Sequence, residues 1–143
     1  MSYLMDVNVL IALVDPSHQF HEAASRFFPI AQKAGWATCP LVQNAFIRIL
    51  GHPSYRDGPG TPHLARQLLI RYIAAPGHQF WPDALSLCDL QRFPSLPGPQ
   101  VLTDLYLLAL AVKNQARFAT LDKNIDSTLV PGGPAAHYLI PAS

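Results

Sequence analysis

The stretch YLMDVNVLIAL at residues 3–13 determines how the chain begins to fold. Residues 3–6 are a short apolar run that predicts a strand, and residues 7–13 have the spacing of a helix that Asp6 or Asn8 could cap. A strand that leads at once into a helix is typical of α/β proteins, in which strands and helices alternate. This opening therefore predicts a parallel sheet, with a carboxylate at the end of its first strand.

The same alternation continues along the rest of the chain. Helices are predicted at residues 18–33, 41–50, 62–75 and 102–115, with a shorter one at 86–93, and strands at 36–39, 78–81, 117–120 and 137–140. We therefore predict an α/β fold in which a parallel sheet of about five strands carries helices on both faces. The length predicts a single domain over residues 1–143.

The composition narrows the class of protein. Half of the 143 residues are apolar and 13% are charged, which predicts buried helices or apolar contact surfaces. The formal net charge is +1, so any affinity for nucleic acid has to come from a local arrangement of the ten Lys and Arg residues. The sequence has no apolar run of membrane length, no secretion signal, and too few cysteines for a disulfide framework. These features predict a cytoplasmic protein with no membrane partner.

Three aspartates lie at the ends of predicted elements. Asp6 ends the first strand, Asp104 begins the apolar helix at 102–115, and Asp122 follows the strand at 117–120. Taken singly, each can be explained as a helix cap or a turn residue. In a doubly wound sheet, however, they share the edge beyond the carboxyl ends of the strands, where a buried group of carboxylates needs a compensating cation. Mg²⁺ and Mn²⁺ suit such oxygen ligands and support phosphodiester hydrolysis.

Six segments, in this order, resemble the motifs of PIN-domain toxins of the VapC type. They are residues 4–13 (LMDVNVLIAL), 18–24 (HQFHEAA), 38–50 (TCPLVQNAFIRIL), 80–82 (FWP), 102–111 (LTDLYLLALA) and 119–122 (ATLD). Each segment is short, but together they cover nearly the whole chain. The resemblance implies a PIN-like three-layer sandwich and an endoribonuclease that depends on Mg²⁺ or Mn²⁺. It also implies a homodimer that a VapB-type antitoxin holds inactive.

On this resemblance, the acidic metal site of the family falls on Asp6, Asp104 and Asp122, which would be both the metal ligands and the catalytic residues. Asn8 and Thr120 would be polar supports close to these acids. The implied reaction is the hydrolysis of RNA phosphodiester bonds at this site.

The chain departs from the family pattern at Gln43, where the family commonly has a glutamate five residues before the arginine that corresponds to Arg48. A neutral amide supplies one negative charge fewer, which puts a second metal ion in question. Asp126, four residues after Asp122, could substitute in part or could be a solvated loop residue. Arg48 could contact an RNA phosphate or an antitoxin carboxylate, or it could form a structural ion pair.

Two other functions fit parts of the pattern. A receiver-type signalling domain shares the α/β architecture and an acidic pocket, but it needs paired acids after the first strand, where this chain has Asp6 alone. The other is a PIN-like domain with weakened catalysis that acts as an RNA- or protein-binding module, which Gln43 favours. A titration with Mn²⁺ separates this module from an active nuclease, because only the nuclease requires metal at the aspartates.

Overall fold

The structure is a computed structural model that describes residues 1–142. In chain order, its elements are β1 (Tyr3–Met5), α1 (Val7–Val14), α2 (His21–Ala34), β2 (Trp36–Thr38), α3 (Pro40–Leu50), α4 (Pro62–Ile73), β3 (His78–Phe80), α5 (Leu102–Lys113), β4 (Arg117–Thr120), α6 (Gly133–Ala136) and β5 (His137–Leu139). Two short 3₁₀ helices, η1 (Pro99–Val101) and η2 (Ser127–Leu129), precede α5 and α6.

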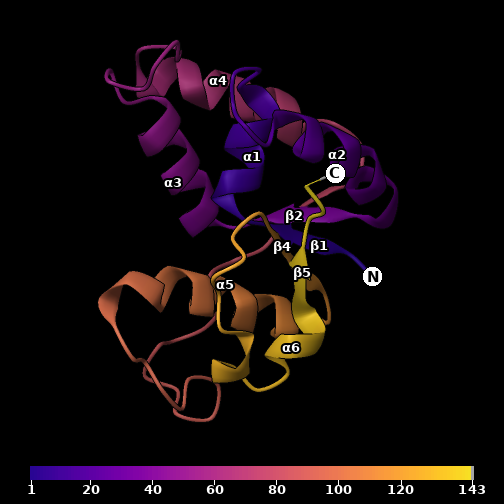
Figure 1. The fold of residues 1–143 in the computed structure, drawn as a ribbon, viewed down its shortest axis with the longest axis vertical. Helices are drawn as coiled ribbons and strands as arrows, with labels where there is room; N and C mark the ends of the chain where they lie inside the picture. Colours follow the sequence, from indigo (N-terminus) through magenta and orange to yellow (C-terminus); the bar gives the residue numbers. More distant parts are fainter. Residues whose placement is uncertain (143) are drawn as a thin grey trace.

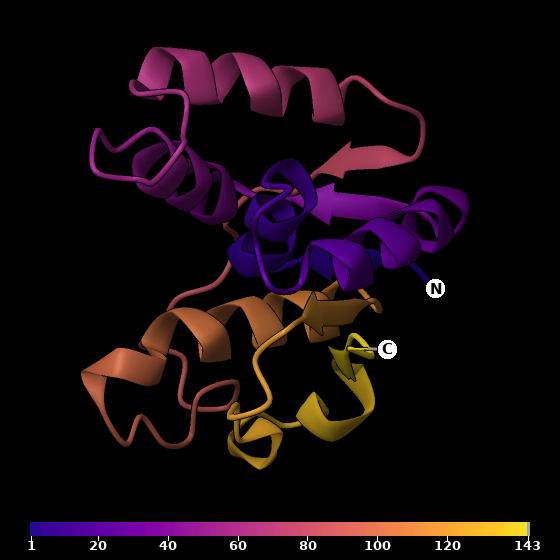
Figure 2. The same ribbon diagram turned by 45° about the horizontal axis from the view of Figure 1, so that its top comes forward.

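The five strands form one parallel sheet in the order β3-β2-β1-β4-β5. The strand arrows that are visible in Figure 2 point the same way. The chain builds outward from β1 to β3 and then returns to place β4 on the other side of β1. The strand order therefore reverses between β1 and β4, and ligands of open α/β sheets bind beyond the carboxyl ends of the strands at such a reversal.

The helices form a layer on each side of this sheet (Figure 1). On one side α1 contacts α2 and α3, and α3 contacts α4. On the other side α5 contacts α6. Right-handed crossovers account for this division, because the chain reverses its direction across the sheet after β3 and so changes face. The predicted α/β sandwich, with a five-stranded parallel sheet and helices on both faces, is confirmed.

Helix α5 contains the longest run of buried residues among the helices that the structure describes. Every residue from Leu105 to Ala111 is buried, which explains why this segment is apolar on all sides. The helix packs against β1 and β4, so Asp104 in its first turn is held by a rigid element next to the sheet. Among residues 1–142, no helix is both long and apolar enough to cross a membrane.

Local turns replace helix at two places where the sequence predicted one. Residues 86–93 form turns, because the side chains of Ser86 and Asp89 each accept a backbone N–H two residues further on, at 3.0 Å. Such bonds compete with helical backbone pairing. Helix α2 begins at His21 rather than His18, whose ring likewise accepts an N–H two residues on. The short helix α6 was not predicted from the sequence.

Candidate functional site

The carboxyl ends of β1 and β4 lie side by side and bring Asp6 next to Thr120. The N–H of Asp6 donates to the carbonyl of Ala119 at 2.9 Å, which extends the pairing of the two strands. The Thr120 hydroxyl donates to Oδ2 of Asp6 at 2.7 Å. Both side chains are buried, and Asp6 is only 4% exposed. One oxygen of a buried carboxylate is thus held in a fixed position.

Asn8 and Asp122 meet at the same hydroxyl group. Nδ2 of Asn8 donates to Oγ1 of Thr120 at 3.4 Å, and Oδ1 of Asn8 accepts the N–H of Leu121 at 3.3 Å. The N–H of Asp122 donates to Oγ1 of Thr120 at 3.0 Å. Thr120 therefore joins Asp6, Asn8 and Asp122 in one hydrogen-bonded network, and all four are residues that the sequence singled out.

Asp104 adds a third carboxylate, which comes from the opposite helix layer. Burial raises the pKa of Asp104, and the charge of Asp122 raises it further. Burial also raises the pKa of Asp6 to about 6, where the Thr120 hydrogen bond opposes the increase and the charges of Asp104 and Asp122 add to it. The structure thus brings the three acids close enough for their charges to interact at one edge of the sheet.

This donor set suits a hydrated divalent cation. Within residues 1–142, no three acidic, histidine or cysteine side chains form a ready-made cluster that could hold a metal ion. Mg²⁺ does not need such a cluster, because it is usually held by one or two carboxylates and keeps several of its waters. A cation between the three acids would offset the repulsion that raises the pKa of Asp6 and of Asp104. The residues therefore fit Mg²⁺ or Mn²⁺ bound partly through water.

Gln43 belongs to a separate chain of hydrogen bonds at the ends of β2 and β3. Its Nε2 donates to Oγ1 of Thr38 at 3.0 Å, and that hydroxyl lies 2.7 Å from Nε2 of His78. Burial lowers the pKa of His78, and the tautomer of its ring decides whether Nε2 donates to the Thr38 hydroxyl or accepts from it. Thr38 and His78 were not predicted as site residues, although Thr38 ends a strand at the same edge as Asp6.

The substitution Gln43→Glu tests whether residue 43 reaches the metal. The carboxylate can accept the Thr38 hydroxyl proton while His78 donates to Thr38 from Nε2, so the hydrogen bonds among these three side chains and the fold are kept. If the new carboxylate also contacts the ion or its waters, the Kd for Mn²⁺ measured by calorimetry should fall about tenfold through one added charge. Gln67→Glu, at an exposed site on α4, adds the same charge elsewhere and serves as the control. Unchanged affinity would mean that residue 43 stays with Thr38, away from the metal.

Two further candidates from the sequence lie outside the acidic network. Asp126 is exposed, and its Oδ1 accepts the N–H of Thr128 at 3.1 Å to cap η2. It is therefore a solvated loop residue rather than a substitute ligand. Arg48 is exposed on α3, where it lines a shallow hollow together with His52 and Arg56.

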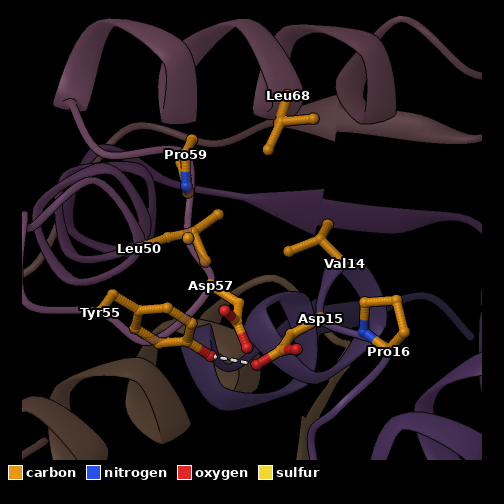
Figure 3. Close-up of a pocket in the computed structure, with 9 residues that line it drawn as sticks. Val14, Asp15, Pro16, Leu50, Tyr55, Asp57, Pro59 and Leu68 are labelled. Carbon is orange, nitrogen blue, oxygen red and sulfur yellow. Dashed lines mark hydrogen bonds between the residues drawn. The ribbon is translucent and has the colours of Figure 1, made fainter.

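A second hollow, of about 200 Å³, lies between α1, α3, α4 and the loop that joins α3 to α4 (Figure 3). The hydroxyl of Tyr55 donates to Oδ2 of Asp15 across it at 2.6 Å, which lowers the pKa of Asp15. The side chains of Val14, Leu50 and Leu68 supply its apolar walls. None of the three acids lines this hollow, so it is separate from the candidate site.

Comparisons with known proteins find similar sequences and similar folds. No family model matches the sequence. The chain is 40% identical over 139 residues to Ribonuclease VapC44 of Mycobacterium tuberculosis. That alignment covers 96% of this chain and 97% of VapC44. It is 36% identical over 124 residues to Ribonuclease VapC39 of the same organism. That alignment covers 85% of this chain and 89% of VapC39. A chain of the crystal structure of VapBC2 from Rickettsia felis, bound to a DNA fragment from their promoter, matches with a TM-score of 0.57 and covers 85% of this chain and 89% of that one. At 11% identity, that likeness shows the fold alone.

Proposed function

The chain belongs to the VapC family of PIN-domain ribonuclease toxins, and from this we propose that it hydrolyses RNA phosphodiester bonds at Asp6, Asp104 and Asp122 with Mg²⁺ or Mn²⁺. The observation that carries the assignment is the buried carboxylate of Asp6, whose pKa is raised to about 6 by burial and by the two other acids. A carboxylate held in that way is suited to a cation rather than to solvent.

In this proposal each residue has a task that follows from its contacts. Asp6 and Asp104 hold the cation from the two helix layers, and Asp122 holds it from the loop after β4. Thr120 fixes Asp6, and Asn8 fixes the loop at Leu121. When bound, the divalent ion would supply a water of lowered pKa and stabilise the charge that develops on the phosphoryl group.

The direct test is the cleavage of a single-stranded RNA by the purified wild-type protein. Cleavage should require Mn²⁺ or Mg²⁺, should fall by about a hundredfold or more on chelation, and should return when Mn²⁺ is added back in excess. Full cleavage in the presence of chelator would remove the metal from the proposal. Binding of RNA without any cleavage would favour the alternative of a catalytically weakened PIN-like binding module.

Family membership also suggests the partners and the setting of this activity. We propose RNA as the substrate, a VapB-type antitoxin as the inhibitor, a homodimer as the assembly, one PIN domain over residues 1–143 and the cytoplasm as the location. The solved structure from Rickettsia felis is a VapBC2 complex, which supports a partner of the VapB type. The exposed Arg48 is available to an antitoxin carboxylate or to an RNA phosphate. A short open reading frame immediately upstream that encodes a DNA-binding fold with an acidic or arginine-bearing tail would identify the antitoxin.

A further inference from the structure

A surface hollow of about 450 Å³ opens directly beside the acidic site. Its lining includes Asp122 together with Phe20, Lys123, Asn124, Leu139 and Ile140. Because Asp122 belongs both to this hollow and to the group of three acids, the two sites are continuous. We call it the Phe20–Lys123 hollow.

Fixed backbone on two sides gives this hollow its shape. On one side, Oδ1 of Asp122 accepts the N–H of Asn124 at 2.9 Å, and the resulting turn leaves the side chains of Lys123 and Asn124 exposed. On the other side, the N–H of Ile140 donates to the carbonyl of Thr120 at 2.9 Å, which continues the pairing of β4 and β5 beyond Leu139.

Residues 141 and 142 close the hollow toward α2. Nη2 of Arg26, which lies on α2, donates to the carbonyl of Ala142 at 3.1 Å. Phe20 immediately precedes α2, is half-buried, and is one of the residues that line the hollow. Leu139, on the edge strand β5, is 44% exposed and presents an aliphatic wall. Hydrogen bonds therefore fix the walls of the hollow both at the turn after Asp122 and at Ala142.

We propose that the Phe20–Lys123 hollow binds the nucleotide of a single-stranded RNA that adjoins the scissile phosphate, with its base against Phe20 and its phosphate at Lys123. This inference rests on the proposed ribonuclease function. A phosphate at the three acids requires the next nucleotide to lie on the surface beside them, and this hollow begins at Asp122. Its lining supplies what a nucleotide needs, namely an aromatic ring for a base face, an amide for a base edge and an ammonium group for a phosphate.

The charge of the molecule makes this local cation important. A net charge of +1 gives little overall attraction for RNA, and the acids themselves repel phosphate. Lys123 directly follows Asp122, so its charge offsets this repulsion where the RNA has to enter. An apolar segment of a protein partner would also fit the walls, but it would not require a lysine at the end next to the acids.

The test measures RNA binding apart from cleavage. A fluorescein-labelled short oligoribonucleotide is titrated by anisotropy, with chelator present, into the Asp104→Asn protein and into the same protein with a second substitution. Lys123→Ala should weaken binding about fivefold and reduce the slope of log affinity against log salt by about 0.7. Phe20→Leu should weaken binding about fivefold or more without changing that slope, and Phe20→Tyr should keep the parental affinity, because only a ring offers a stacking face.

Lys113→Ala is the matched control, since this exposed lysine lies in the last turn of α5, at the opposite end of the helix from Asp104. An equal loss of affinity in Lys113→Ala would overturn the proposal, because the effect of Lys123 would then be general charge. Unchanged affinity in both Lys123→Ala and Phe20→Leu would also overturn the proposal, provided that circular dichroism shows both variants to be folded. That result is the one expected if the hollow binds a protein partner instead of RNA. If the wild type cleaves RNA while these variants bind normally, the subsite alone fails. If the variants lose binding as expected but the wild type never cleaves, the subsite stands and the nuclease assignment fails.

Discussion

Asp104→Asn should reduce the metal-dependent cleavage of RNA by about a thousandfold or more. The substitution keeps the shape of the side chain and removes the charge of one of the three acids that would hold the cation. Because a catalytic metal supplies both the nucleophilic water and the stabilisation of charge, a weakened metal site loses several kcal/mol of transition-state stabilisation, and about 1.4 kcal/mol corresponds to a tenfold change in rate. The measurement is single-turnover cleavage of a labelled RNA at saturating Mn²⁺.

The fold should survive this substitution. Asp104 is half-buried, and the residues that anchor α5 in the core are Leu105 to Ala111, which are unchanged. Asp126→Asn is the matched control, because it makes the same chemical change at an exposed aspartate that caps η2. That control should cleave at the wild-type rate. Full activity in Asp104→Asn, or an equal loss in Asp126→Asn, would contradict the assignment of the site.

The sequence predicted the layers of the fold because its periodicity is strong and consistent. Strand-to-helix passages such as residues 3–14 recur along the chain, and the right-handed crossover rule then limits how the strands can be ordered. The apolar helix at Leu102–Lys113 was predicted for the same reason, since a segment that is apolar on every side must be buried. Residues 86–93 were predicted wrongly, because bonds from Ser86 and Asp89 to nearby N–H groups override a weak helical pattern.

The location of the acidic site could be predicted from the sequence, but its hydrogen bonds could not. Strand-end positions are enough to bring Asp6, Asp104 and Asp122 to one edge of a parallel sheet. The contacts of Gln43 are different, because they depend on how α3 is oriented over β2 and on a histidine that lies in another strand. No spacing along the chain encodes the approach of His78 to Thr38, which are 40 residues apart. The hollow beside Asp122 was missed for a similar reason, since its walls come from three distant segments.

Asp6→Asn should make the metal-free protein more stable at neutral pH, by about 2–3 kcal/mol in the free energy of unfolding. The pKa of Asp6 is raised from 3.8 to about 6 in the folded state. Because the pKa of Asp6 is raised on folding, the contribution of this residue to stability is complete below about pH 4 and is lost as the pH rises through about 6. At about 1.4 kcal/mol per pKa unit, the ionised Asp6 destabilises the folded state by about 3 kcal/mol, which Asp6→Asn should relieve. The loss of a carboxylate at the start of α1 removes about 0.5 kcal/mol of helix-dipole stabilisation from that gain.

Asparagine fits this position without breaking existing bonds. The Asp6 side chain makes no capping hydrogen bond to α1, and the Thr120 hydroxyl can donate to the amide oxygen as it does to the carboxylate. Urea unfolding of both proteins with chelator, from about pH 4 to neutral pH, should therefore show a fall in stability with pH that is smaller in Asp6→Asn than in the wild type. Asp126→Asn should follow the wild-type curve.

Mn²⁺ should remove most of this difference in stability. A ligand that binds only the folded state stabilises it by about 2.7 kcal/mol at a hundredfold excess over its Kd, so the wild type should gain more from Mn²⁺ than Asp6→Asn, which has lost a ligand. An ordinary structural aspartate would give the opposite pattern, with Asp6→Asn less stable at every pH and with both proteins indifferent to the metal. A gain in stability without metal and a loss of metal response in the same variant are expected together only if Asp6 is kept buried and charged in order to bind a cation.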